Sequence, residues 1–121
     1  MSAFNQNPNH FLRLYKATGY SLQGLKSTFQ YEQAFRLEVY ILIALIPLAI
    51  WFGSSPLDYY LLIGSWILVM IVELLNSAVE AAIDRIGMEK HELSGRAKDI
   101  GSAAVMVSVL LAIGAWVAVL L

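Results

Sequence analysis

Three uncharged apolar segments constrain this chain more than any other feature of its sequence. They are residues 39–52, 59–72 and 100–121, with 14, 14 and 22 residues. A helix needs about 20 mainly apolar residues to cross a hydrocarbon core of roughly 30 Å. Hydrophobic residues make up 59% of the chain and charged residues 14%, against about 45–50% and 25% in a soluble domain. The sequence therefore predicts an all-α integral membrane protein with three transmembrane helices.

The second apolar segment continues directly into a row of acidic residues. Glu80 and Asp84 follow Glu73 after seven and eleven residues, so on an α-helix all three point within about 20° of one direction. Together with Asn76 and Ser77 they form a polar stripe roughly 16 Å long that begins inside the apolar region. An ionised carboxylate at the bilayer centre costs about 2.5–3.5 kcal/mol on insertion scales. We therefore expect the stripe to face protein, a cation or a water-filled cavity.

The rest of the sequence predicts where the other elements lie. Residues 1–9 are polar and are expected to form a flexible N-terminus ahead of a single membrane domain at residues 10–121. Apolar residues recur at helical spacing over residues 10–29 while basic residues take another face. This pattern predicts an amphipathic helix on the membrane surface. The transmembrane helices are expected at about residues 31–52, 57–86 and 95–121.

Smaller features refine this arrangement. The turn at residues 53–58 contains Gly, Ser and Pro and is short, so the first two spans should be antiparallel neighbours. Gly19 and Gly24 are candidate breaks in the surface helix. Glu32 and Arg36 are spaced to form an ion pair along one helix face.

Several residues near the acidic stripe also have plain structural interpretations. Ser94 is a candidate N-cap for the third span. Asp84 is interpreted as structural, pairing with Arg85 or with a lysine of the second loop. Trp66, well inside a span, is expected to pack against neighbouring helices. Glu38 fits either a pairing between helices or a contact with substrate.

The basic residues predict the orientation of the chain in the membrane. All eight lie in the N-terminal region or between the second and third spans: Arg13, Lys16, Lys26, Arg36, Arg85, Lys90, Arg96 and Lys98. The turn at residues 53–58 and the C-terminus have none. By the positive-inside rule, the N-terminus and the second loop are cytoplasmic and the C-terminus lies outside.

The cytoplasmic end of the predicted bundle gathers carboxylates and cations. The set is Arg13, Lys16, Glu32, Glu73, Asn76, Glu80, Lys98 and Asp99. Sites for Mg²⁺ commonly use one or two carboxylates with substrate phosphates and water, and phosphoryl transfer needs such a metal, cationic groups and a base. These residues predict a site at the membrane surface for a polar molecule from water and an apolar one from lipid.

Other classes of site lack their residues. The chain has no cysteine and a net charge of −1, so thiolate chemistry is excluded and nucleic acid is not an indicated partner. It also contains no P-loop, no kinase glycine-rich loop and no HExxH or GxSxG motif, which excludes a kinase of the soluble type.

Two long motifs resemble the prokaryotic diacylglycerol kinase family. They read ELLNSAVEAAIDR at residues 73–85 and HELSGRAKDIGSAAV at residues 91–105, and KATGYS at 16–21, Glu32 and AFR at 34–36 add to the likeness. The resemblance covers roughly residues 11–121. It implies a multi-pass kinase domain of the bacterial inner membrane, built as a homotrimeric bundle with composite sites between subunits. The N-terminus would be cytoplasmic and the C-terminus periplasmic.

The resemblance implies an activity and roles for single residues. The activity is ATP- and Mg²⁺-dependent phosphorylation of diacylglycerol to phosphatidic acid, by direct in-line transfer at the cytoplasmic interface, in lipid recycling. Glu73 would be the base that takes the proton of the lipid hydroxyl, and Asn76 would orient the site. Glu32 and Glu80 would hold Mg²⁺ against the nucleotide phosphates.

Two larger sets of residues are implied by the same resemblance. The positions implied to bind ATP are Arg13, Tyr20, Glu32, Glu80, Glu89, Lys90, His91, Lys98 and Asp99. The positions implied to bind the lipid are Arg13, Ala17, Thr18, Gly19, Tyr20, Ser21, Leu22, Lys26, Ser27, Thr28, Phe29, Ala34, Phe35, Arg36, Leu37, Glu38, Glu73 and Ser102.

Three alternatives stay open. The acceptor could be undecaprenol, because related enzymes of other bacteria phosphorylate that polyprenol and share the site motif. A proton or ion carrier could use Glu73 as a titrating group. A carrier predicts an acid near the midplane without a phosphate-binding cluster, whereas here the acids run towards Lys98 and Arg13. A purely structural helix-bundle subunit would leave the cost of the acidic stripe unexplained.

Overall fold

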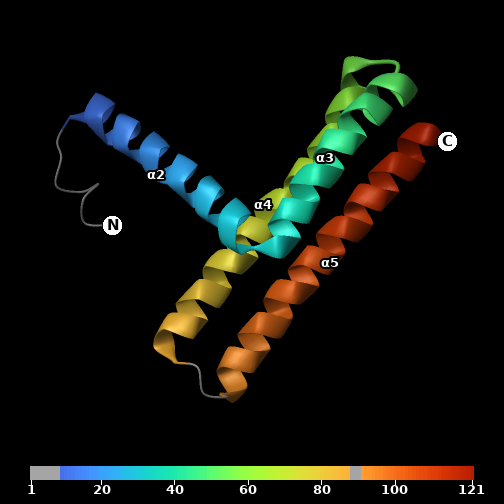
Figure 1. The fold of residues 1–121 in the computed structure, drawn as a ribbon. Coiled ribbons are helices and arrows are strands. Elements are labelled where there is room, and N and C mark those ends of the chain that lie inside the picture. The colour runs from blue at the N-terminus through green and yellow to red at the C-terminus, as the bar shows by residue number, and fades with distance from the viewer. Residues whose placement is uncertain (1–8, 88–90) are drawn as a thin grey trace.

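The computed structural model describes residues 9–87 and 91–121, and every element of regular secondary structure within them is an α-helix (Figure 1). The helices are α2 (His10–Tyr31), α3 (Gln33–Phe52), α4 (Pro56–Ile86) and α5 (Glu92–Leu120). The last three are long and apolar enough to cross a membrane. The described chain thus confirms the all-helical class and the three candidate spans.

Helix α4 is the centre of the arrangement. It contacts α3 on one side and α5 on the other, and the three helices form an elongated bundle. As predicted, α3 and α4 are antiparallel and joined by a short turn. Helix α2 leaves the bundle at an angle near the middle of α4, and its N-terminal end lies towards the level of the α3–α4 turn (Figure 1). The acidic stripe therefore occupies the half of α4 beyond the α2–α3 junction.

The ends of the helices are set by local hydrogen bonds. The side chain of Asn9 accepts from the backbone N–H groups of the first turn of α2. Ser55 accepts from the N–H of Asp58 at 3.2 Å and so caps α4. The predicted cap of α5 was wrong, since the helix begins at Glu92 and not after Ser94. The reason is that Nδ1 of His91 accepts from a backbone N–H of the first turn at 3.1 Å.

The junction between α2 and α3 differs from both expectations. Helix α2 continues through Gly19 and Gly24 and breaks at Glu32, whose backbone is extended (φ −109, ψ 108). Arg36 donates from Nη1 to the carbonyls of Phe29 and Gln30, each at 2.9 Å, in place of the expected pairing with Glu32. The last carbonyls of a helix lack partners within it, and a guanidinium satisfies two of them here.

A single chain buries little of its apolar surface. Phe35, Leu62, Val69 and other core residues are almost fully covered, but no residue of α2 is buried. Large apolar side chains stay exposed along every helix; Trp51, for example, is 82% exposed. Such extensive apolar exposure marks surfaces that meet lipid or other protein, as expected for membrane-spanning helices.

Candidate active site

Glu73 lies at the point where the uncharged part of α4 ends, and the structure buries it. Its side chain is 7% exposed, and that of Glu38 on α3 is 8% exposed. The two side chains come from facing helices and lie close enough for their carboxyl groups to influence each other electrostatically. Oε1 of Glu38 is buried and has no hydrogen-bond partner within the described chain.

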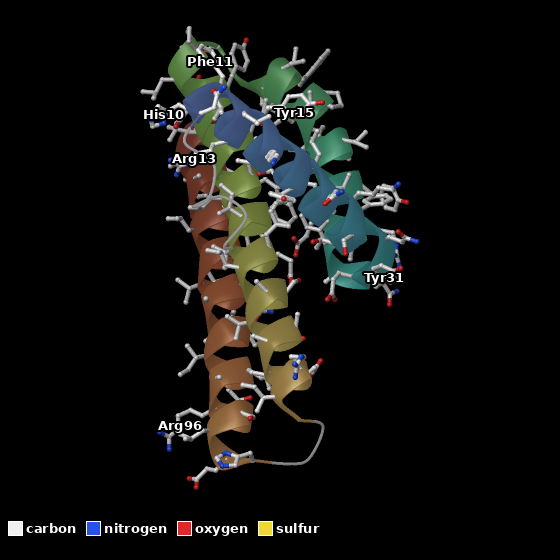
Figure 2. All side chains as sticks on the ribbon, turned by 90° about the vertical axis from the view of Figure 1, so that its left-hand side faces the viewer. His10, Phe11, Arg13, Tyr15, Tyr31 and Arg96 are labelled. Atoms are coloured by element: carbon white, nitrogen blue, oxygen red, sulfur yellow. The ribbon has the colours of Figure 1, made fainter. Side chains whose placement is uncertain are left out.

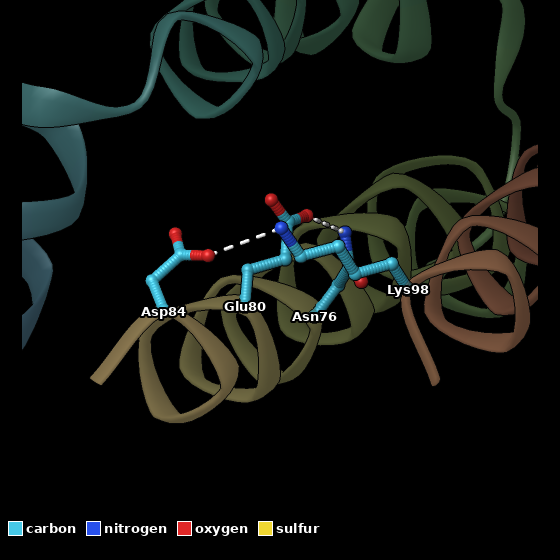
Figure 3. A network of polar contacts seen from close by, with 4 residues as sticks. All are labelled: Asn76, Glu80, Asp84 and Lys98. Atoms are coloured by element: carbon cyan, nitrogen blue, oxygen red, sulfur yellow. Dashed lines mark hydrogen bonds and ion pairs between the residues drawn. The ribbon is translucent and has the colours of Figure 1, made fainter. Parts of the chain in front are cut away.

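Asn76 and Glu80 continue the stripe one and two turns further along α4. Nδ2 of Asn76 donates to Oε1 of Glu80 at 2.9 Å (Figure 3). The other side of the Asn76 amide lies against the backbone of Gly101 on α5, where an added Cβ would overlap it. Oδ1 of Asn76 is buried without a partner in the part of the chain that the structure describes. Gly101 therefore provides the space that lets Asn76 point towards Glu80.

Asp84 ends the stripe and pairs with α5. Nζ of Lys98 donates to Oδ1 of Asp84 at 3.0 Å, with both side chains about half exposed. Figure 3 shows Lys98 reaching from α5 across to α4 beside Glu80. The predicted pairing of Asp84 with a lysine is thus confirmed. That lysine lies on α5 and not in the loop, and it is one of the predicted ATP ligands.

A groove of about 570 Å³ lies between α2 and the same half of α4. Glu32, half-buried at the helix junction, lines it together with Ser21 and Thr28 of α2. Leu74 and Ser77 of α4 form the opposite wall. The groove is mainly apolar, and Ser77 lies one turn beyond Glu73 on α4. It offers room for an apolar molecule close to the acidic stripe.

Other predicted ATP ligands are spread over the chain. Arg13 and Tyr20 lie on α2, and Figure 2 shows Arg13 towards the opposite end of the molecule from Arg96, at the start of α5. His91 caps α5, and Asp99 is exposed in its second turn. The predicted ligands Glu89 and Lys90 lie outside the described residues. A single chain therefore groups Asn76, Glu80 and Lys98 and keeps Arg13 away from them.

The predicted lipid ligands also divide between two regions. Those of α2, from Ala17 to Phe29, lie mostly on exposed surface, and some of them border the groove. At the start of α3, Phe35 is buried against the bundle, and Arg36 is engaged by the end of α2. Ser102 is exposed on α5.

Glu32 and Glu80 fit a magnesium–nucleotide site in which the protein supplies only one or two carboxylate ligands. Among residues 9–87 and 91–121, no three His, Cys, Asp or Glu side chains converge to form a complete protein cage. Mg²⁺ that also binds phosphates commonly takes only one or two carboxylates from the protein. Glu32 at the groove and Glu80 on the stripe are oxygen donors of that kind.

Comparison with known proteins identifies the family. A family model described as prokaryotic diacylglycerol kinase matches residues 19–120. The chain is 49% identical over 110 residues to the diacylglycerol kinase of Escherichia coli strain K12, covering 91% of this chain and 90% of the relative. It is 56% identical over 95 residues to that of Haemophilus influenzae, covering 78% and 80%. The chain belongs to the prokaryotic diacylglycerol kinase family. A prokaryotic diacylglycerol kinase from Pseudomonas aeruginosa is 45% identical over 109 residues, covering 90% and 89%.

Two features of this diacylglycerol kinase family member escaped sequence reasoning. The contact between Glu38 and Glu73 could have been found, because these acids flank the uncharged segments 39–52 and 59–72. Two antiparallel segments of equal length joined by a short turn bring their outer ends to one level. The close approach of Gly101 to Asn76 had no such signal, because it depends on how α5 is rotated against α4.

Proposed function

We propose that this prokaryotic diacylglycerol kinase phosphorylates diacylglycerol at its acidic stripe. The terminal phosphoryl group of ATP passes directly to the primary hydroxyl of the lipid, which gives phosphatidic acid, ADP and a proton. The observation that carries the proposal is the placement of the buried Glu73 one turn from the apolar groove and one turn from the Asn76–Glu80 pair. Membership of the family supports the reaction class.

Glu73 is the base that accepts the proton of the lipid hydroxyl. It is 7% exposed, so its carboxylate is poorly hydrated and can be directed at a hydroxyl from the groove. A base positioned at the acceptor hydroxyl is the usual protein contribution to phosphoryl transfer. Asn76 donates to Glu80 at 2.9 Å and is proposed to orient the carboxylate of Glu80 within the site.

Glu32 and Glu80 are proposed to hold Mg²⁺. When bound, this ion neutralises the negative charge that develops on the transferring phosphates. Lys98 adds a positive charge beside Glu80, on the neighbouring helix. His91, Asp99 and the positions Glu89 and Lys90 complete the proposed nucleotide side, where α5 begins.

The nucleotide site is proposed to need a second chain. Arg13 and Tyr20 are proposed ATP ligands, yet Arg13 lies far from Lys98 in one chain (Figure 2). A homotrimer in which α2 of one subunit reaches the stripe of the next would unite both halves in composite sites. The exposed apolar faces of the spans leave ample surface for such contacts.

The proposed setting is the bacterial inner membrane. The distribution of the eight basic residues supports an orientation with the N-terminus and the start of α5 in the cytoplasm and the C-terminus in the periplasm. Helix α2 is proposed to lie on the cytoplasmic membrane surface as an amphipathic helix. This requires a different angle to α4 from that in the single chain, where the N-terminal end of α2 lies towards the level of the α3–α4 turn. Residues 10–121 are proposed to form a single kinase domain. This orientation exposes the stripe to cytoplasmic ATP and the groove to lipid.

The deciding experiment measures phosphorylation by the purified protein in mixed detergent–lipid micelles with Mg-ATP. Diacylglycerol is expected to be the better acceptor, and undecaprenol supplied in parallel tests the alternative substrate. Radiolabel transferred to neither alcohol, together with no binding of Mg-nucleotide, would exclude kinase activity. A carrier would then be tested by proton flux in proteoliposomes.

A further inference from the structure

Trp66 makes a polar contact inside the uncharged part of the bundle. Its indole Nε1 donates to the backbone carbonyl of Glu38 at 2.9 Å, which links α4 to α3. The residue lies in the uncharged segment 59–72, where a tryptophan N–H has no water to bond and needs a protein partner. The expectation of simple packing for Trp66 was therefore incomplete.

The acceptor of this bond is the residue that faces Glu73. Glu38 is held at its backbone by Trp66, while its buried side chain lies near that of Glu73, close enough for the two carboxyl groups to interact electrostatically. Trp66 and Glu73 are seven residues apart on α4, about 10.5 Å along the axis and within about 20° of one direction. Trp66 and Glu73 belong to one continuous helix. The bond from Trp66 to α3 therefore also fixes the level of α3 relative to Glu73.

A small slide of α3 along α4 would have two effects at once. It would break the Trp66–Glu38 bond and separate the two carboxyl groups. Both carboxyl side chains are almost fully buried, so few water molecules can compensate for a lost contact. The indole bond thus restrains the sliding of α3 along α4, which is the movement that would separate Glu38 from Glu73.

We propose that Trp66 is a positioning residue for phosphoryl transfer, whose indole N–H fixes α3 at the level where the carboxyl group of Glu38 lies against Glu73. The inference rests on the proposed role of Glu73 as the base. Trp66 would then influence the rate of phosphoryl transfer from a position two helical turns before Glu73, within the apolar part of the bundle.

Trp116 provides a matched comparison within the same molecule. Its Nε1 donates to the backbone carbonyl of Leu62 at 3.0 Å and links α5 to α4. Donor, acceptor type, length and partial burial are alike in the two bonds. The Trp116 bond, however, ends on an apolar residue eleven positions before Glu73 and involves no carboxyl group. A general contribution of such bonds to helix packing should therefore appear equally at both tryptophans.

The experiment compares Trp66→Phe with Trp116→Phe, in the wild-type background and in Glu38→Asp. The kcat value and the KM values for Mg-ATP and diacylglycerol are measured in mixed micelles. In the wild-type background, Trp66→Phe should lower kcat by about threefold to tenfold, the range for one lost neutral hydrogen bond. The KM for Mg-ATP should stay within about twofold. In Glu38→Asp the shorter side chain already separates the acids, so the same substitution should cost less than about twofold.

Trp116→Phe should leave kcat within about twofold of the wild type in both backgrounds. A variant that carries β-(3-benzothienyl)alanine at position 66 keeps the shape of the indole and replaces its N–H by sulfur. This analogue decides the matter if Trp66→Phe fails to fold, because it should reproduce the loss of kcat without a packing defect.

Three results would overturn the inference: an unchanged kcat in the benzothienyl variant, an equal loss in both backgrounds, or an equal loss in Trp116→Phe. The proposed role of Glu73 has its own test, since Glu73→Gln with near-normal turnover would refute that role. The coupling between Trp66 and Glu38 is measured independently of that result, so the two failures are distinguishable.

Discussion

The two ends of the α3–α4 hairpin differ in how their polar groups are satisfied. At the turn, Oδ2 of Asp58 accepts from both the backbone N–H and the hydroxyl of Ser54, each at 3.0 Å. The hydroxyl of Tyr59 donates to the carbonyl of Gly53 at 3.1 Å. At the other end, Oε1 of Glu38 is buried and has no partner in the described chain.

This difference separates polar groups that satisfy one another within the chain from a buried carboxyl oxygen that has no partner in its described part. A buried polar atom without a partner costs about 1–3 kcal/mol, so the acid end is less stable than it could be. The turn end carries no such cost, because its donors and acceptors match one another. Substitutions at the acid end should therefore change activity more than stability, and substitutions at the turn should do the reverse.

The largest effect is expected for Glu73→Gln. The amide keeps the shape of the side chain but cannot take the proton of the lipid hydroxyl, so kcat should fall about 10²- to 10⁴-fold. The measurement is phosphatidic acid formation in micelles, with the thermal denaturation midpoint of the same sample as the control for folding. Near-normal turnover would remove Glu73 from the proposed role and would weaken the contrast between the two ends.

The next effect is expected for Gly101→Ala. The added Cβ would overlap the side chain of Asn76 and turn it away from Glu80. A displacement of about 1 Å near reacting groups can cost about 10²-fold in rate, so kcat should drop by about tenfold to a hundredfold.

The matched control for this change is Gly114→Ala on the same helix, where a Cβ meets nothing within 4 Å. Its kcat should stay within about twofold of the wild type. Equal losses in the two variants would mean that any small change of α5 is harmful, and that Asn76 is not specifically involved.

These features were not equally accessible from the sequence. The existence and direction of α3, α4 and α5 followed from segment length and apolar content, because the bilayer leaves a chain few alternatives. The position of each helix end depended on single hydrogen bonds, such as the one that makes His91 the cap of α5. The pattern of residue types alone does not show whether His91 or Ser94 caps the helix.

Side-chain contacts between helices were the least accessible. The face of α4 that carries Glu73, Glu80 and Asp84 was predicted from periodicity alone. The close approach of Gly101 to this face depends on how α5 is rotated against α4. Residue spacing within one helix contains no information on that rotation.

A smaller effect is expected for Lys98→Met. The loss of a charge-assisted contact with a phosphate should raise the KM for Mg-ATP by about tenfold, with a smaller change in kcat. Asp84→Asn should change this KM by less than about threefold, since the exposed Lys98–Asp84 pair contributes little by itself.

The control for Lys98→Met is Arg96→Met, which removes another exposed cation two residues earlier on α5. Arg96 lies 3.7 Å from Glu92, within its own helix, and is not among the proposed ligands. Its KM for Mg-ATP should stay within about twofold. An equal rise in both variants would indicate a general effect of positive charge on nucleotide capture and not a specific contact.

The smallest effect on activity is expected at the turn, for Ser55→Ala. This change removes the hydroxyl that caps α4 by accepting from the N–H of Asp58 at 3.2 Å. Loss of such a cap costs about 1 kcal/mol of stability, so the denaturation midpoint in detergent should fall. The kcat value should not change, because the turn lies at the far end of the hairpin from the acidic stripe.

The control is Ser65→Ala in the middle of α4. The Ser65 hydroxyl donates only to the carbonyl of Leu62 in its own helix, at 3.3 Å, and such bonds add little to helix stability. Its denaturation midpoint should therefore match the wild type. If Ser55→Ala lowered kcat while leaving the midpoint unchanged, the turn would contribute to catalysis, and hydrogen-bond satisfaction would no longer distinguish the two ends of the hairpin.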